Sequence, residues 1–508
     1  MRYILDFFYK YFIVCLIGVV VYFIFINFAN LKLKTADGSI YLSTAENIAR
    51  HKGFVVSYNL CQCFNTLFHP IWAYYQPVYS LFASLFINHG GIVQVIKANI
   101  LLFALNVMII FYLLEELMPT RLNVLFIFYL VFSSSFFLSA LYAWTEQLHF
   151  LCFITTFILF LKFKDRPGCL FCLGILNAFI MLIRVAHLYN FMAYFPLILI
   201  SKDTLRQKFY KALFLLGGFF LAYGLYQLFC LLVYHVSYPE YARPGASYGL
   251  ARFYSGVAYD LKKVGLQIPL GAVFSAQHLS YIGEHLRDFF YRMLFFLWPA
   301  LFYYFLPIKK RLEGGFIELC FFQSIFVILG YSLTFYWLTY SFDSLRYAMI
   351  PFVLTSIAGW YCLYHGLSLS QPGFKKIAGV VLLLSILAPQ VSKFIAFKCK
   401  VMNPPLWEKT YYKNANNSYE WIDRNLPKEI LVASDEDQQG YFMHRPFIST
   451  PVGNSFTCAN LALFNRIYSP DYYLLSWDVK DKCFASIAHT KIYSNRDFRI
   501  LKVIKNKL

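Results

Sequence analysis

Charge is scarce in this sequence. Lys, Arg, Asp and Glu together make up 14% of its 508 residues, whereas 59% are hydrophobic and 21% are aromatic. A soluble domain carries about 25% charged residues, so this composition excludes an ordinary soluble protein and predicts one that crosses a membrane several times. Acidic residues are scarcer than basic ones: there are 26 Asp and Glu against 45 Lys and Arg, which gives a formal net charge of +19. The basic residues fall in short clusters between apolar runs, which is typical of membrane topology and argues against a nucleic-acid-binding stripe.

Several patterns that mark common sites are also missing. No Gly-rich phosphate-binding loop occurs on a segment predicted to lie inside, which argues against an ATP-driven engine. Cys61-Gln62-Cys63 has the wrong separation for a zinc knuckle and no matching pair nearby. The sequence therefore predicts no definite cofactor, and it leaves a divalent metal open without supporting one. A disulfide between Cys458 and Cys483 is compatible with their predicted outer positions, but spacing alone does not settle it.

About eleven apolar runs are long enough to be membrane helices. They lie at 11–28, 94–114, 122–139, 148–162, 168–183, 188–201, 212–235, 289–307, 316–338, 346–364 and 377–396. Arg184, His187 and Asn190 interrupt the pair between 168 and 201, and if this pair were one bent helix, every later segment would change sides.

The basic clusters give these helices an orientation. Inner loops of a membrane protein carry an excess of Lys and Arg, and with the amino terminus inside as an uncleaved anchor the alternation holds. The inner clusters are then Lys162, Lys164 and Arg166; Lys202, Arg206, Lys208 and Lys211; Lys309, Lys310 and Arg311; and Lys375 and Lys376. An odd number of crossings places the carboxyl terminus outside.

Two domains follow from this reading. Residues 1–397 are expected to form an all-α membrane domain with outer loops at 29–93 and 236–288, and residues 398–508 a small outer α/β domain. In the latter, the pattern predicts a helix at 418–425 and strands at 430–434, 472–477 and 498–504.

Ionisable residues gather at the predicted outer face. Asp37 follows the first apolar run, Glu146 lies between the third and fourth, and Arg184 and Arg346 occupy short outer turns. Such groups near a membrane are functional candidates, and we expect these four to line one cavity. The alternatives are a solvated loop acid for Asp37 and an interfacial acid for Glu146. The arginines run against the topological bias and favour an anionic ligand.

Four further residues are weaker candidates for the same site. Lys97, near the outer start of the second helix, is a candidate phosphate ligand, although a lysine there often extends to the lipid head groups. Tyr41, His69 and Tyr347 are candidates for orienting a substrate, and His69 is alternatively an ordinary loop histidine.

This combination suits the transfer of a sugar from a lipid-linked phosphate. Arginines hold the phosphate and stabilise the negative charge that grows on it as the glycosidic bond breaks. A single carboxylate takes the proton of the attacking acceptor. Glycoside hydrolysis, in contrast, normally needs a pair of carboxylates.

The motifs also resemble a known family. The stretch from Asp37-Gly38-Ser39-Ile40-Tyr41-Leu42 through Ala45-Glu46-Asn47-Ile48-Ala49 to Gln76-Pro77-Val78-Tyr79-Ser80-Leu81 is similar to the first outer loop of C-type integral-membrane glycosyltransferases, especially protein O-mannosyltransferases and lipid A aminoarabinose transferases. Thr145-Glu146-Gln147-Leu148, Arg184, and Arg346-Tyr347 before Pro351 are further matches. Two departures are Gly38, where many relatives have an acid, and Val185, where proline is expected.

The resemblance implies an enzyme of the bacterial inner membrane with a periplasmic site. It would be an inverting glycosyltransferase using a polyprenyl-phosphate sugar, with Asp37 as catalytic base, a lipid, glycan or protein as acceptor, and no nucleic acid partner. Alternatives are a polymerase or ligase of lipid-linked glycans and a secondary transporter or flippase without chemistry. A transporter is disfavoured because no internal repeat is evident.

Overall fold

The computed structural model describes the chain in segments. These are residues 2–31, 36–54, 58–59, 77–115, 118–184, 187–201, 203–234, 320, 323–324, 349–368, 391–392, 394–399, 406–435, 447–450, 458–476, 481–484 and 487–504.

The chain divides into two compact units. The helical unit comprises Met1–Asn27, Asn99–Leu141 and Thr145–Phe397, and the sheet unit comprises Phe28–Ala98, Tyr142–Trp144 and Lys398–Leu508. The sheet unit therefore contains the C-terminal segment together with the whole of 29–93, the segment predicted as the first outer loop.

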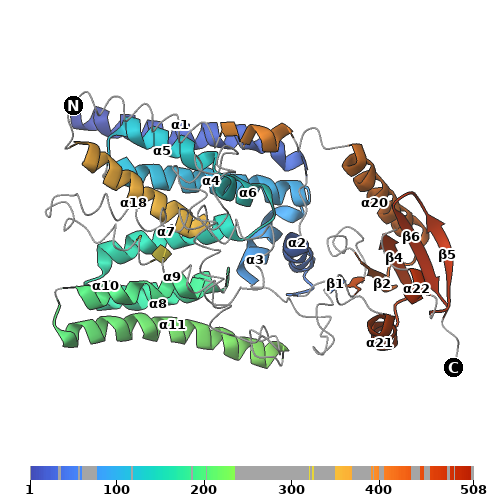
Figure 1. Cartoon of the computed structure of the whole chain (residues 1–508). Helices are drawn as coiled ribbons and strands as arrows, with labels where there is room; N and C mark the ends of the chain where they lie inside the picture. The colour runs from blue at the N-terminus through green and yellow to red at the C-terminus, as the bar shows by residue number, and fades with distance from the viewer. Residues whose placement is uncertain are drawn as a thin grey trace, which may run out of the picture. The chain divides into compact units, whose positions relative to one another are not determined.

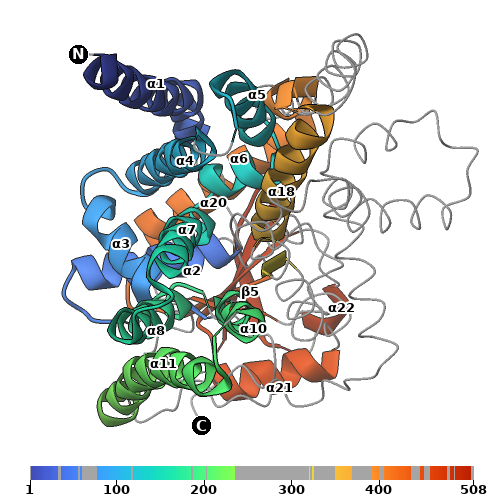
Figure 2. The same ribbon diagram turned by 90° about the vertical axis from the view of Figure 1, so that its left-hand side faces the viewer.

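The helical unit is a bundle whose longer helices run roughly along one direction (Figures 1 and 2). Its described helices are α1 (Arg2–Phe25), most of α4 (Ile92–Glu115), α5 (Thr120–Val131), α6 (Ser134–Leu141), α7 (Glu146–Phe163), α8 (Pro167–Met181), α9 (His187–Met192), α10 (Tyr194–Ile200), α11 (Leu205–Tyr234) and α18 (Met349–Ser368). Pro119 precedes α5 and Pro167 begins α8. Proline suits a helix start because its φ is preset and its missing N–H would have no partner there.

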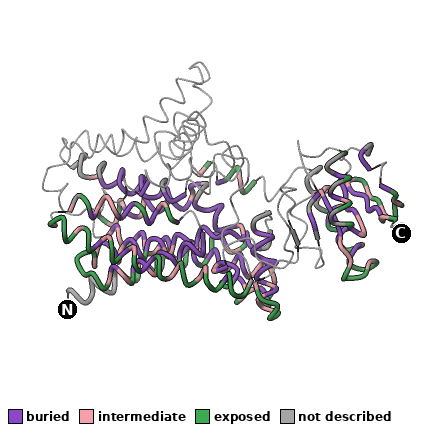
Figure 3. The backbone as a smooth tube through the Cα atoms, turned by 90° about the horizontal axis from the view of Figure 1, so that it is seen from below, coloured by how far each residue is buried: buried purple, intermediate pink, exposed green. Residues whose placement is uncertain are grey.

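Four described helical stretches are long and apolar enough to cross a membrane: Phe12–Ala29, Ile92–Glu115, Glu146–Phe163 and Leu205–Val233. In the most apolar stretch of each helix, 67% of the residues are buried in α4 and 50% in α7, against 33% in the stretch near the N-terminus and 17% in α11. Exposed apolar residues recur along the first helix, at Phe12, Leu16, Val19, Val20, Phe23 and Ile24, between buried ones, and Figure 3 colours the backbone by this exposure. Exposed apolar faces on α1 and α11 are the faces expected to contact lipid, with α4 and α7 inside.

The structure changes two of the predicted spans. The run 122–139 was predicted as one helix, but it is divided into α5 and α6 at Phe132 and Ser133. The backbone N–H and hydroxyl of Ser133 both donate to Leu130 O, at 3.0 and 2.8 Å, which closes a tight turn and ends the helix. The run 188–201 is likewise divided into α9 and α10 at Ala193.

Other predicted spans are only partly described. The run 289–307 and the loop 236–288 lie outside the described residues, as do most of 316–338 and 377–396. The total of about eleven crossings and the orientation stay predictions.

Helices α8 and α11 pack at unusually close range. Gly174 of α8 and Gly218 of α11 lie in this contact, and a methyl group added to either glycine would overlap a carbonyl oxygen of the other helix, Leu215 O and Phe171 O respectively. The two backbones approach this closely because neither position has a side chain.

The sheet unit is built on six strands in the order β1-β3-β2-β4-β6-β5. Their bounds are β1 (Tyr58–Asn59), β2 (Val432–Ser434), β3 (Phe447–Ser449), β4 (Tyr472–Ser476), β5 (His489–Ser494) and β6 (Phe498–Val503). The first four in this order pair in parallel, and β6 pairs antiparallel with both β4 and β5. The predicted strands at 430–434, 472–477 and 498–504 are confirmed as β2, β4 and β6.

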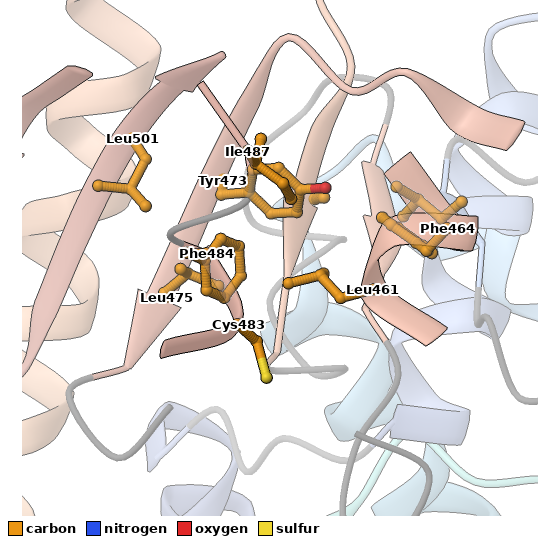
Figure 4. Packing of buried hydrophobic residues seen from close by; sticks show 10 residues of the cluster. Leu461, Phe464, Tyr473, Leu475, Cys483, Phe484, Ile487 and Leu501 are labelled. Carbon is orange, nitrogen blue, oxygen red and sulfur yellow. The ribbon is translucent and has the colours of Figure 1, made fainter. Parts of the chain in front are cut away.

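Helices complete the sheet unit: α2 (Ala36–Ala49), α3 (Pro77–Ile87), α20 (Leu406–Asn425), α21 (Cys458–Tyr468) and α22 (Asp481–Phe484). The helix predicted at 418–425 is the last part of α20, which begins earlier. Apolar side chains from the sheet, α21 and α22 form one core, shown in Figure 4: Ala433, Ile448, Leu461, Phe464, Tyr473, Leu475, Cys483, Phe484, Ile487 and Leu501. A disulfide between Cys458 and Cys483 joins α21 to α22, which spacing had left open.

Candidate functional site

Gln147 holds the start of α7 inside the helical unit. Its side-chain N–H groups donate to Ser139 Oγ at 2.7 Å and to Phe136 O at 3.0 Å, while its side-chain oxygen accepts from Asn106 Nδ2 at 2.8 Å. Gln147, Ser139 and Asn106 are all buried. These hydrogen bonds hold α7 against α4 and α6.

Glu146 and Arg184, predicted separately as site residues, form a buried ion pair. Glu146 is 1% exposed and Arg184 is 7% exposed, and Nη1 of Arg184 donates to Oε1 of Glu146. Arg184 lies just after α8, where its backbone N–H donates to Ile180 O at 3.2 Å. Charges buried this deeply require a partner, since removal of one leaves the other at a cost of about 3–5 kcal/mol. The structure thus brings these two predicted residues together.

A second polar contact lies one helical turn further along α7. The rings of His149 and His187 meet with their Nε2 and Nδ1 atoms 3.1 Å apart, and His187 Nε2 lies 2.8 Å from Asn177 Oδ1. All three residues are buried. These contacts tie α7 to α8 and to the start of α9.

Sequence reasoning gave no role to Gln147, His149 or Asn177, and it noted His187 only as a polar residue beside Arg184. Gln147 and His149 were available as polar interruptions in an apolar run, which is the usual sequence signal of an interior polar contact in a membrane protein. Gln147 pairs with Asn106 and His149 pairs with His187, which are 41 and 38 residues away, so these pairings were not visible in the sequence.

The other predicted residues have separate positions. Asp37 lies in the first turn of α2, so the polar stretch predicted as a loop is helical from Ala36. Tyr41 is buried on α2 and packs edge-to-face on Tyr79 of α3, with ring centroids 5.1 Å apart. Lys97 is partly buried on α4.

Asp37, Tyr41 and Lys97 belong to the sheet unit, whereas Glu146 and Arg184 belong to the helical unit. His69, Arg346 and Tyr347 lie outside the described residues. The predicted convergence of Asp37, Glu146, Arg184 and Arg346 on one cavity stays a prediction. Among the residues that are described, no three His, Cys, Asp or Glu side chains group as metal ligands do.

Sequence comparison finds no relative: no protein-family model matches the chain, and no curated protein matches it. Solved structures do match. The structure of ArnT from Cupriavidus metallidurans bound to undecaprenyl phosphate covers 96% of this chain and 97% of its own, with 10% identity and a TM-score of 0.54. The apo structure of ArnT covers the same shares, with 11% identity and a TM-score of 0.55.

The chain shares the fold of ArnT. Because the likeness covers nearly the whole of both chains, it extends beyond a common bundle of apolar helices. It confirms, at the level of the fold, the resemblance to C-type integral-membrane glycosyltransferases, and it agrees with the apolar helices that make this chain an integral membrane protein. Arabinofuranosyltransferase AftD from Mycobacteria also matches, over 97% of this chain and 40% of its own, with 13% identity and a TM-score of 0.48.

Proposed function

We propose that this protein is an inverting glycosyltransferase that moves a sugar from a polyprenyl-phosphate donor to an acceptor on the periplasmic face of the bacterial inner membrane. The observation that carries the proposal is the full-length fold likeness to ArnT, which has been crystallised with undecaprenyl phosphate. The buried Glu146–Arg184 pair supports it from within this chain, because it places a guanidinium in the interior of the helical unit.

The proposed reaction needs one base and a phosphate site. The acceptor hydroxyl or amine attacks the anomeric carbon as the bond from that carbon to the phosphate oxygen breaks, and the electron pair of that bond remains on the phosphate. Asp37 takes the acceptor proton. No general acid is needed, since the departing phosphate is a weak base.

Arg184, Arg346 and Lys97 are proposed to bind the phosphate, and Glu146, Tyr347, Tyr41 and His69 to orient donor or acceptor. A guanidinium has five N–H donors in a planar fork, and this geometry suits charge-assisted hydrogen bonds to phosphate oxygens. Glu146 also neutralises Arg184 before the donor arrives, which lowers the cost of holding the arginine in a buried position.

The periplasmic placement has its own support. The basic residues in short loops predict an outer carboxyl terminus, and the Cys458–Cys483 disulfide lies in that C-terminal segment. Disulfides persist in oxidising compartments such as the periplasm. Both observations favour the same side of the membrane for the sheet unit.

Binding of undecaprenyl phosphate to the purified full-length protein in lipid nanodiscs tests the proposal. We expect saturable binding that weakens at least tenfold when undecaprenol, which lacks the phosphate, replaces it, because a charge-assisted hydrogen bond contributes about 1.5–3 kcal/mol. Equal affinity for the two lipids would show that no phosphate site exists. Mass spectrometry of lipids that co-purify with the protein would then identify the sugar.

A further inference from the structure

The segment that carries Arg184 lies between two helices. α8 ends at Met181, three residues earlier, and α9 begins at His187. The Arg184 carbonyl accepts a hydrogen bond from the backbone N–H of His187 at 2.9 Å. The position of His187 therefore bears directly on the position of the Arg184 backbone.

The two polar contacts between α7 and this segment have the same spacing. Glu146 and His149 are three residues apart on α7, which places them on one face of the helix, and their partners Arg184 and His187 are also three residues apart. The ion pair and the histidine pair thus connect the same two parts of the chain.

Asn177 gives the histidine pair a direction. Its Nδ2 donates to Leu173 O at 2.7 Å, so its Oδ1 is the atom that accepts at 2.8 Å from His187 Nε2–H. His187 Nδ1 is then an acceptor, and it receives the Nε2–H of His149 at 3.1 Å. In this chain of hydrogen bonds both histidines carry their proton on Nε2, which fixes the tautomer and the orientation of each ring.

We propose that His149 and His187 are positioning residues that hold Arg184 in place to receive a lipid phosphate, with Asn177 as their anchor. The inference rests on the proposed function of Arg184 as a phosphate ligand. Neither histidine touches the ligand in this scheme. They act through Arg184, and the ligand they serve is a phosphate monoester or diester on a polyprenyl chain.

A double-mutant cycle separates positioning from simple packing. The dissociation constant for undecaprenyl phosphate would be measured with the full-length protein in nanodiscs for the wild type, His187→Leu, Arg184→Gln and the double variant. We expect Arg184→Gln to weaken binding about 10- to 100-fold, since a charged hydrogen bond is lost. His187→Leu should weaken binding about 5- to 10-fold with Arg184 present and less than about twofold without it, because residues that act as a unit are not additive.

Two further variants complete the design. His187→Gln keeps an N–H group able to donate to Asn177 and should recover most of the affinity lost in His187→Leu. Thr156→Val is the matched control: Thr156 is buried on α7, and its hydroxyl donates at 2.9 Å to Phe153 O and accepts at 3.4 Å from the Tyr194 hydroxyl of α10, so the variant removes a buried contact between helices that does not involve Arg184. This variant should bind like the wild type. If His187→Leu does not fold, His149→Leu takes its place in the cycle with the same criterion.

The outcomes are distinct. An equal loss from His187→Leu in both backgrounds, or no recovery with His187→Gln, would overturn the positioning role while leaving Arg184 as a ligand. Unchanged binding in Arg184→Gln would instead remove the phosphate role of Arg184 on which the inference rests.

Discussion

The two units bury their polar side chains in different ways. In the helical unit, side chains bind side chains across helices, as in Gln147 with Asn106 and Glu146 with Arg184. In the sheet unit, two carboxylates bind backbone groups at or beside the ends of strands: Asp435 accepts from the Ser476 backbone N–H at 3.0 Å, and Asp471 accepts from that of Leu431 at 2.9 Å.

The difference follows from how each unit satisfies its backbone. Membrane helices pair their own N–H and C=O groups, so polar side chains among them remain available to bind one another or a ligand. A sheet with short strands leaves backbone groups at the strand ends, and nearby carboxylates bind them. The comparison favours the helical unit as the source of the arginines proposed to bind phosphate, while the proposed base, Asp37, on α2, and Lys97 belong to the sheet unit.

The largest expected effect separates these two roles. Asp37→Asn keeps the size of the side chain and removes the base, so sugar transfer should fall about 10²- to 10⁴-fold, the usual contribution of general base catalysis. Binding of undecaprenyl phosphate should change little. Both quantities can be measured on one nanodisc preparation, with Asn88→Ala, an exposed position of the same unit, as the control. Transfer by Asp37→Asn at the wild-type rate would mean that Asp37 is not the base.

Much of the helical unit was predictable because each long helix in it corresponds to a long apolar run in the sequence. The predicted run 94–114 is α4, Ile92–Glu115, almost to the residue. The division at Ser133 was missed. The hydrogen bond from its hydroxyl to Leu130 O ends the helix, but the run around it stays apolar enough to be predicted as one span. In the site, Glu146 and Arg184 were found as unusual charges, but their pairing depends on how α7 and α8 pack.

The sheet unit was less predictable because its pairing is non-local. β1 has only two residues, Tyr58 and Asn59, and pairs with Phe447 and Ile448 nearly four hundred residues later. A two-residue strand carries no alternation of apolar and polar residues. β3 was missed for a similar reason, having three residues.

Loss of the disulfide should affect the sheet unit alone. Cys458→Ser with Cys483→Ser removes a bridge that spans 25 residues, and a loop of this size is worth about 2–4 kcal/mol through restriction of the unfolded chain. Hydrogen exchange of peptides from β4 and α21 in the full-length protein should speed up, while peptides from α4 and α7 keep their protection. Equal acceleration in both sets would show that the two units do not unfold separately.

The close contact of α8 and α11 allows the helical unit to be destabilised instead of the sheet unit. Gly218→Ala should destabilise this unit by about 1–3 kcal/mol, as overpacking usually does, because the added methyl group overlaps Phe171 O. Gly224→Ala is the matched control on α11, since nothing lies within 4 Å of the added carbon. This control should be neutral or slightly stabilising, because alanine favours a helix over glycine. Similar melting temperatures for the two variants would refute the close contact.

The smallest expected effect is on the pH dependence of stability. Two aspartates, one in each unit, should contribute to it with opposite signs. Burial raises the pKa of Asp435 in the sheet unit above its usual 3.8, although hydrogen bonds from Ser476 oppose this. Hydrogen bonds from Lys211 and then Ser201 lower the pKa of Asp203, which lies before α11 in the helical unit, below 3.8.

Linkage gives the two directions. Folded Asp435 holds its proton more tightly than the unfolded chain does, so its contribution to stability falls as pH rises from 3.8 through the raised pKa. Asp203 has the opposite effect: its contribution is present above pH 3.8 and is lost as pH falls through the lowered pKa.

Hydrogen exchange of β2 and β4, corrected for the intrinsic pH dependence, should therefore show slower opening toward acid in the wild type and an opening rate that does not change with pH in Asp435→Asn. Asp203→Asn should leave β2 and β4 unchanged and alter only peptides around 203–211. Protection of β2 and β4 in the wild type that increases with pH would show that hydrogen bonding, not burial, dominates at Asp435.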